Sequence, residues 1–306
     1  MKRRPASVLL GLLVLAACDG SDSGVASESG VPLAPVTVYA SAEQAAGLRE
    51  EFSAFTAETR IPVTLKIADS ESNVSKVIAN LGAPAADVLV TPNVTDIWRA
   101  ADEGALRPLT SRAFTAVPPV LKDPDRTWVA IGVRYAIIGV APGTPAAPVG
   151  DYGDLSSSEL RGKVCLSSST LPVNRSLIAM LIEDIGIKPA ERMVRAWVRN
   201  LAASPYATEA QLVNALRSGI CGYGIVSSSV DLEGLSKIAP KPLYIDIDGI
   251  GVARHATQAE SAQTLVHWML NSSSLPDPRS SNGKNIGLAG WRDEDVRLLV
   301  ERAGYR

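Results

Sequence analysis

The stretch WVAIGVRYAIIGV at residues 128–140 is a long apolar run that only Gly132, Arg134 and Gly139 interrupt. A second run of similar character, LYIDIDGIGVA, covers residues 243–253. Apolar runs rich in β-branched residues predict buried strands. Both runs exceed the length of an average strand, so we expect each to pass from one lobe of the protein to another and to form a hinge.

Shorter predicted strands alternate with predicted helices before and after the first long run. The strands are expected at residues 36–40, 61–67, 86–91, 164–166 and 222–226. Helical spacing of apolar residues predicts helices at residues 43–60, 72–81, 95–105, 175–185, 190–201, 209–217 and 258–270. Strands separated by helices form mainly parallel sheets with helices on both faces. The predicted fold class is therefore α/β, with two lobes that are each a mixed or mainly parallel sheet flanked by helices.

The first part of the chain has the pattern of an export signal. Residues 2–4 are basic, an apolar stretch follows, and the segment ends in Leu-Ala-Ala-Cys at residues 15–18. This order predicts a lipoprotein signal peptide at residues 1–17 with Cys18 as the acylated residue. Asp19 resembles the signal that retains lipoproteins in the inner membrane. An ordinary cleaved signal peptide with an incidental cysteine is the alternative.

The rest of the chain is divided by composition and by the two hinge runs. Residues 18–35 are rich in Ser, Gly and Asp and predict a flexible tether. We predict an N-terminal lobe from residues 36–131 plus 247–290, and a C-terminal lobe from residues 132–246. Residues 291–306 form a predicted C-terminal helical extension.

Several classes of function find little support in the composition. The formal net charge is −2, and basic residues do not form a stripe interleaved with aromatics, so no nucleic-acid partner is predicted. The two histidines, His255 and His267, have no partner at metal-ligand spacing, and we predict structural roles for both. No resident cofactor or metal centre is therefore predicted.

Signals for enzymatic catalysis are equally sparse. The chain contains no GxSxG elbow and no GxGxxG loop. Residues 281–284, Ser-Asn-Gly-Lys, match the S-x-x-K pattern, but they lie in a polar stretch where a turn is expected. We predict that the protein is not an enzyme; a periplasmic enzyme with Ser281 as nucleophile and Lys284 as base is the alternative.

Two cysteines remain besides Cys18 among the three in the chain. Cys165 and Cys221 both lie on or beside predicted buried strands. An exported protein meets an oxidising compartment, which favours a disulfide between them. Two buried, unpaired thiols are the alternative.

Polar side chains follow the carboxyl ends of five predicted strands, the edge where doubly wound sheets bind ligands. Each such group alone is typical of a helix N-cap, but five of them on two lobes favour a ligand cleft. The last strand, YGIV at residues 223–226, runs into Ser227, Ser228 and Ser229. The apolar spacing after these serines predicts that a helix begins within residues 230–235.

Six segments, in order, span most of residues 36–270. They are residues 38–43 (VYASAE), 86–90 (ADVLV), 98–106 (WRAADEGAL), 162–169 (GKVCLSSS), 174–177 (NRSL) and 249–256 (GIGVARHA). Together they resemble the extracellular solute-binding proteins of ferric-iron ABC transporters. The resemblance implies a two-lobed periplasmic binding protein of the type II-like, transferrin-like kind, with its ligand cleft at the hinge.

The resemblance also implies a function in transport. Such proteins close on a ligand and present it to a permease. We therefore expect a monomeric, lipid-anchored solute-binding subunit of an ABC importer, located in the periplasm and held to the inner membrane beside its permease. A carrier or sensor that hands its ligand to another envelope protein is an alternative.

The ligand residues that the family implies match this chain only in part. The family commonly has a histidine or tyrosine early in the loop after the first strand, where this chain has Ala42 or Glu43. The family's glutamate matches Glu71. A tyrosine is often found late in the first hinge strand, where Val140 stands instead.

The largest departure concerns two adjacent tyrosines that the family places after the strand led by Cys221. In this chain the matching positions are Ser229 and Val230. Ferric iron is a hard cation that prefers anionic oxygen donors, and a serine hydroxyl is neutral at pH 7. An anion, a small organic solute or an iron chelate is therefore a better candidate ligand than bare ferric iron.

Two further points complete the expectation for the cleft. Arg134 and Arg175 would balance a negative ligand. As an alternative, ferric iron would bind through Glu43, Glu71 and Asp231 together with an exogenous anion. The predicted ligand-binding residues are Ser41, Glu43, Glu71, Asn93, Arg134, Ser168, Ser169, Asn174, Ser228 and Ser229.

Overall fold

The computed structural model describes residues 33–82, 85–145, 149–273, 275 and 286–306. Residues Leu33–Arg306 form one compact unit. The predicted signal peptide with Cys18 and the S-x-x-K match at residues 281–284 lie outside the described residues. In the ranges that are described, no helix is long and apolar enough to cross a membrane.

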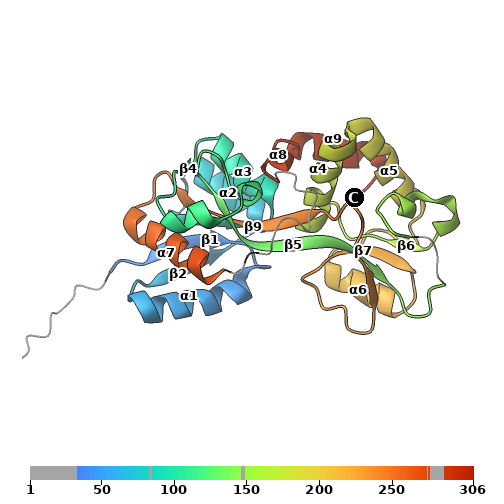
Figure 1. Ribbon diagram of the computed structural model, residues 1–306, viewed down its shortest axis with the longest axis horizontal. Helices are drawn as coiled ribbons and strands as arrows, with labels where there is room; N and C mark the ends of the chain where they lie inside the picture. The colour runs from blue at the N-terminus through green and yellow to red at the C-terminus, as the bar shows by residue number, and fades with distance from the viewer. Residues whose placement is uncertain (1–32, 83–84, 146–148, 274, 276–285) are drawn as a thin grey trace, which may run out of the picture. The chain divides into compact units, whose positions relative to one another are not determined.

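The N-terminal lobe is a sheet with helices on both faces. Its elements are β1 (Val36–Ala40), α1 (Ala45–Thr59), β2 (Val63–Ile67), α2 (Ser70–Ile78), β3 (Val88–Thr91), α3 (Val94–Asp102), β4 (Leu106–Arg107), the 3₁₀ helices η1 (Arg112–Ala116) and η2 (Pro119–Leu121), and α7 (Ala259–Ser272). β1 pairs in parallel with β2 and with β3. Figure 1 shows α1 and α3 on opposite faces of this sheet.

The C-terminal lobe repeats this plan with shorter strands. Its elements are η3 (Asp154–Ser156), η4 (Ser158–Leu160), β6 (Val164–Cys165), α4 (Pro172–Ile185), α5 (Ile187–Arg199), α6 (Glu209–Arg217), β7 (Tyr223–Ser227) and β8 (Ser236–Ile238). β6 and β7 are parallel neighbours. A disulfide joins Cys165 to Cys221, so the structure has the disulfide and not the two free thiols.

Two long strands, β5 (Val129–Val140) and β9 (Ile245–Ala253), run through both lobes. They pair with each other in antiparallel fashion. β9 continues to β3 and β4, while β5 continues to β7 and β8. The strand order is β2-β1-β3-β9-β5-β7-β6, which gives a mixed sheet. The predicted two-lobed α/β fold with two hinge strands is confirmed.

The helix predicted within residues 230–235 is wrong. Turns occupy this segment and lead into β8, which pairs with β5. The Asp231 carboxylate accepts a hydrogen bond from the backbone N–H of Glu233, and Gly234 has a φ of 78°, outside the right-handed helical region. Such a short segment gains too few helical hydrogen bonds to offset the nucleation free energy, so turn geometry prevails.

The C-terminal segment forms two helices that contact both lobes. α8 (Gly287–Gly290) packs against α3 of the N-terminal lobe and α4 of the C-terminal lobe. α9 (Asp293–Ala303) packs against α4 and α5. Figure 1 shows both helices above the hinge strands. The predicted C-terminal helical extension therefore places side chains of α9 close to the junction of the lobes.

Candidate ligand-binding cleft

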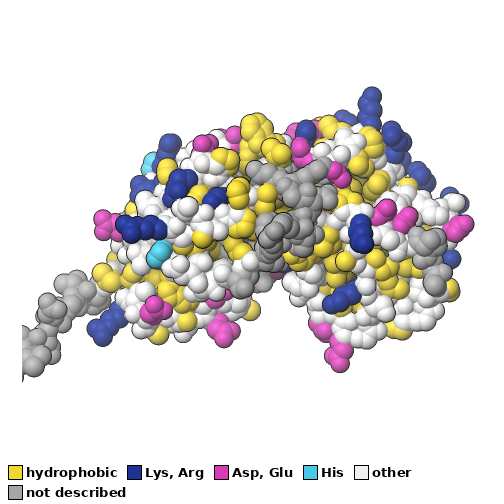
Figure 2. Space-filling model, viewed as in Figure 1, with side chains coloured by type: hydrophobic (Ala, Val, Ile, Leu, Met, Phe, Trp, Pro, Cys, Tyr) yellow, Lys and Arg dark blue, Asp and Glu magenta, His cyan; other side chains and the backbone are white. Residues whose placement is uncertain are grey.

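Two cavities adjoin between elements of the two lobes, and Glu43 lines both of them. The first cavity has a volume of about 360 Å³ and is bounded by the ends of β1, β2 and β3, the loop before α4, and α9. The second cavity, of about 510 Å³, is bounded by α1, the hinge strands, Glu209 and Ser229. Figure 2 shows acidic and basic side chains interspersed over the described part of the face of the molecule that it draws, with no large region of a single charge.

The structure distributes the predicted ligand residues unevenly between these cavities. Ser41, Glu43, Glu71, Asn93 and Ser169 line the first cavity. Glu43, Arg134 and Ser229 line the second. Ser229 and the neighbouring Val230, the positions where the family resemblance implies a tyrosine pair, both border the second cavity. The strand ends of the two lobes therefore meet, as the sequence pattern suggested.

Two of the predicted residues are occupied in holding the backbone. Asn93 is buried at the start of α3, where its Oδ1 accepts hydrogen bonds from Asp96 N at 2.8 Å and from Thr95 Oγ1 at 2.7 Å. Asn174 Nδ2 donates to the backbone oxygens of Ser167 and Ser168 at 3.2 and 2.9 Å. These contacts are those of a helix cap and a loop brace.

Ser168 and Ser228 are likewise engaged. Ser168 Oγ lies 3.0 Å from Thr170 Oγ1 and accepts from Thr170 N. Ser228 Oγ accepts a hydrogen bond from Tyr135 N on β5 at 3.0 Å, and Ser228 N donates to Tyr135 O. Ser228 lines a third cavity, beside β8, and not the two cavities described above.

Arg134 is the centre of an ion network that crosses the hinge. Its Nη1 donates to both oxygens of Asp248 at 2.8 and 3.0 Å, and its Nη2 donates to Asp246 at 3.2 Å and to the backbone oxygen of Pro92. Gln44 of the N-terminal lobe also donates to Asp248, at 2.7 Å. Because both of its Nη groups already donate to protein oxygens and its side chain is only 13% exposed, Arg134 ties the hinge together rather than serving as a cation for a ligand.

Asp246 is the most deeply buried member of this network. Burial raises its pKa to about 7, while Arg134 and a hydrogen bond from Ser176 act in the opposite direction. The Ser176 Oγ donor lies 2.6 Å from Asp246 Oδ1 and comes from α4, so the network reaches into the C-terminal lobe. The carboxyl is thus balanced between its charged and neutral forms near neutral pH.

Carboxylates border the second cavity more densely than the sequence pattern suggested. The pKa of Glu43 is raised, chiefly because burial removes water from its carboxylate. The charge of Arg134 acts to lower this pKa, and the charge of Asp248 acts to raise it. The pKa of Glu209 is also raised, chiefly by burial, although the backbone N–H of Ser227 donates to its carboxylate. Glu209 was not predicted as a site residue; its place in the first turn of α6, facing the end of β7, was the only available signal.

The carboxylates proposed for direct iron binding do not assemble. Glu71 lines the first cavity and is 65% exposed. Asp231 instead pairs with Arg217 at 2.9 Å and lines the cavity beside β8, with neither Glu43 nor Glu71. Within the described ranges, no group of three or more His, Cys, Asp or Glu side chains is arranged to hold a metal ion.

Arg175 of α4 is also held by protein carboxylates. It pairs with Asp96 of α3 at 3.1 Å and with Asp293 of α9. Burial would raise the pKa of Asp293, but Arg175 and Arg297 outweigh this and hold the pKa below its usual value. Arg175 therefore joins α3, α4 and α9 at one wall of the first cavity.

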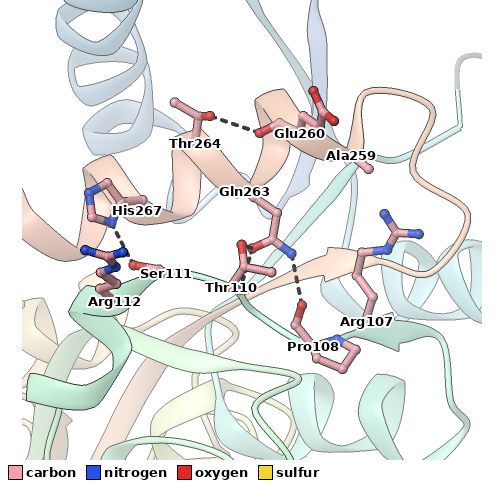
Figure 3. A pocket seen from close by; sticks show the side chains of 10 residues that line it. All are labelled: Arg107, Pro108, Thr110, Ser111, Arg112, Ala259, Glu260, Gln263, Thr264 and His267. Carbon is pink, nitrogen blue, oxygen red and sulfur yellow. Dashed lines mark hydrogen bonds between the residues drawn. The ribbon is translucent and has the colours of Figure 1, made fainter.

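A further hollow lies outside this cleft. A groove of about 760 Å³ lies between β4–η1 and α7, and elements of the N-terminal lobe alone line it. Figure 3 shows that its polar groups bond to one another: Ser111 Oγ lies 2.8 Å from His267 Nδ1, and Gln263 bonds to Thr110 and Pro108. A ligand in this groove would touch one lobe only, so it would not favour closure of the hinge.

Comparisons with known proteins agree with the fold and with the resemblance. No family model matches the chain. The chain is 23% identical over 304 residues to iron uptake protein A1 of Synechocystis sp.. This alignment covers 93% of this chain and 84% of that protein. The ferric binding protein from Campylobacter jejuni shares the fold with a TM-score of 0.80 at 19% identity, over 89% of this chain and 100% of that chain.

A Trichodesmium protein solved in complex with iron and citrate ligands is similar in the same way. Its TM-score is 0.76 at 22% identity, over 89% of this chain and 100% of that chain. The names of all three proteins refer to iron: iron uptake for the Synechocystis protein, ferric binding for the Campylobacter jejuni protein, and a complex with iron and citrate for the Trichodesmium protein. The chain is therefore similar in sequence to an iron uptake protein and shares its fold with solved ferric-binding proteins.

Proposed function

We propose that this protein is the solute-binding subunit of an ABC importer and that its ligand is an iron chelate, a ferric carboxylate being the first candidate. The observation that carries this proposal is the cleft itself: both lobes line it, it holds hydroxyls and carboxylates, and the described residues contain no cluster of three or more His, Cys, Asp or Glu side chains that could hold a metal ion in place of the tyrosine pair. The names of its relatives, an iron uptake protein and a protein complexed with iron and citrate, support iron as part of the cargo.

The number of anionic oxygen donors that the protein supplies indicates the chemistry of the ligand. Bare ferric iron needs several anionic oxygen donors. Of the residues at the expected positions, only Glu43 and Glu71 carry charge, because Ser229 is neutral and Val230 is apolar. A chelate brings its own metal ligands, so the protein needs to supply only hydrogen bonds and a few charges. Ser41, Ser169 and Thr170 line the first cavity and offer such groups from both lobes.

Closure would follow from contacts made by both lobes at once. Ser41 and Glu43 follow β1, whereas Ser169 and Thr170 precede α4, and β5 and β9 connect the two lobes that carry these sets. A ligand that bonds to both sets stabilises the closed arrangement over any arrangement that separates them. We propose that the closed form docks on a permease in the inner membrane, with the protein monomeric in the periplasm and anchored through Cys18.

A second candidate is direct binding of ferric iron with an exogenous anion. Glu43 and Glu71 line the same cavity, and this placement favours the idea. The distinction is testable because the two ligands differ in what must be added to the protein.

The test uses the chain from Leu33 onward, purified without iron, with isothermal titration of ferric citrate, citrate alone, and ferric iron with bicarbonate. We expect ferric citrate to bind, and Ser169→Ala to weaken its binding by about tenfold or more, since a hydrogen bond to a charged group contributes about 1.5–3 kcal/mol. If the protein binds ferric iron in the presence of bicarbonate but does not bind ferric citrate, the second candidate is favoured. Absence of binding in all titrations would contradict both.

A further inference from the structure

We propose that Arg297 of α9 binds the anionic arm of the ligand, and that Glu71 is its exchangeable partner, displaced when the ligand enters. This inference rests on the proposed function, because it concerns the same cleft. It assigns a ligand contact to the C-terminal helix, which packs on the C-terminal lobe but lines the first cavity through Val296, Arg297 and Val300.

Three arginines line the two cavities, and they differ in how many donors they have left. Arg134 donates to two aspartates and a backbone oxygen. Arg175 is fixed between Asp96 and Asp293. Arg297 has five N–H donors, as every arginine has, yet its ion pairs both use Nη2. Among the described cavity-lining residues, Arg297 is therefore the cation best able to receive a ligand carboxylate.

The Glu71–Arg297 pair is weak by its geometry. The nitrogen and oxygen lie 3.7 Å apart, beyond a normal hydrogen bond, and the side chains are 49% and 65% exposed. Exposed ion pairs of this kind contribute little, so a ligand can replace Glu71 with only a small loss. Asp293, one turn earlier in α9, lies 2.9 Å from the same nitrogen and keeps the guanidinium at the cavity wall.

A buried hydroxyl next to Glu71 points to a polar ligand at this end of the cavity. Ser70 lines the first cavity, and its Oγ is buried without a hydrogen-bond partner in the part of the chain that the structure describes. Buried polar atoms are nearly always paired. Because Ser70 lines the same cavity as Arg297, its unused hydroxyl is a donor on offer to a carboxylate that enters in place of Glu71.

The remaining charge of the cavity suits the other part of a chelate. Glu43 lies where the first cavity meets the second, whereas Arg297 borders the first cavity alone. The cleft therefore presents a carboxylate toward one part of a ligand and a guanidinium toward another. A metal held by an organic polycarboxylate has both a cationic centre and a free anionic arm, which matches this arrangement.

The experiment compares two arginines of the same helix. Arg302 pairs with Glu191 at 3.9 Å, is 56% exposed and lines neither cavity, so Arg302→Gln is the matched control for Arg297→Gln. Both variants and Glu71→Gln are titrated with ferric citrate and with citrate alone, and each is checked for an unchanged melting temperature. We expect Arg297→Gln to lose at least about tenfold in affinity, Arg302→Gln to stay within about twofold, and Glu71→Gln to bind as well as the parent or more tightly.

Two results would overturn the inference while leaving the proposed function intact. One is equal binding by Arg297→Gln and Arg302→Gln in a parent protein that binds ferric citrate. The other is a loss of affinity in Glu71→Gln as large as that in Arg297→Gln, since Glu71 would then be a ligand contact rather than a displaced partner. If the parent protein binds neither probe, the proposed ligand class and this inference fall together.

Discussion

Arg134 and Arg297 meet the same cleft in opposite ways. Arg134 is 13% exposed and every contact it makes joins fixed parts of the hinge. Arg297 is 49% exposed and its contact across the cavity, to Glu71, is a long one. A buried charge whose donors are all paired must stay paired, whereas an exposed charge can change partners at little loss. The difference separates residues that maintain the hinge from those available to a ligand.

The first way to break this comparison is to remove Arg134. In Arg134→Met, Asp246 remains buried without its cation, and we expect a loss of about 3–5 kcal/mol in the free energy of unfolding. Urea denaturation followed by circular dichroism would measure it. Arg134→Lys keeps a charge but not the planar fork, so an intermediate loss is expected. A loss below about 1 kcal/mol in the methionine variant would show that the network is not structural.

The second prediction concerns the pH dependence of the same network. The pKa of Asp246 is raised from 3.8 to about 7 by burial, so between these values the folded state binds a proton that the unfolded state does not. The stability that this group contributes is therefore full below about pH 4 and is lost as pH rises to about 7, by at most about 1.4 kcal/mol per pH unit.

The variant Asp246→Asn is the control, because its amide does not titrate between pH 4 and pH 7. We expect the unfolding free energy of the parent protein, relative to the variant, to fall from pH 4 to pH 7 and then to level off. Chemical denaturation at half-unit pH steps would show it. A difference that is constant over this range would mean that Asp246 is ionised throughout and that Arg134 outweighs burial.

The hinge strands could be predicted from the sequence, whereas the role of a single polar side chain could not. The hinge strands were visible because strand periodicity and apolar runs are local signals, and β5 and β9 formed where residues 128–140 and 243–253 indicated. Ser41, Glu43 and Ser169 were expected to lie at one cavity for a related reason, because the carboxyl ends of parallel strands meet by topology, and all three line the first cavity. Asn93 follows the same rule but serves as a cap, and the sequence does not distinguish a cap from a ligand contact.

Contacts between distant segments left no such trace. Glu71 and Arg297 come together only because α9 packs back across the lobes, and neither neighbourhood in the sequence indicates the other. Arg134 and Arg175 were expected to balance a ligand; Arg134 interrupts a predicted hinge strand and Arg175 begins a predicted helix. The carboxylates that occupy them lie on other elements, such as β9 and α9, and pairing of this kind appears only in three dimensions.

The smallest predicted effect is the stability change on removing Arg297, and it sharpens the comparison most. Arg297 makes one long exposed pair with Glu71 and one closer pair with Asp293 within its own helix. Such pairs contribute about 0.3–0.5 kcal/mol, so Arg297→Gln should unfold within about 1 kcal/mol of the parent protein. Arg302→Gln should behave alike, because Arg302 is 56% exposed and lies 3.9 Å from its partner Glu191. A residue that a ligand can recruit must be one that the fold does not need. If Arg297→Gln loses nearly as much free energy of unfolding as Arg134→Met, the Glu71–Arg297 pair is part of the lobe junction and not an exchangeable contact.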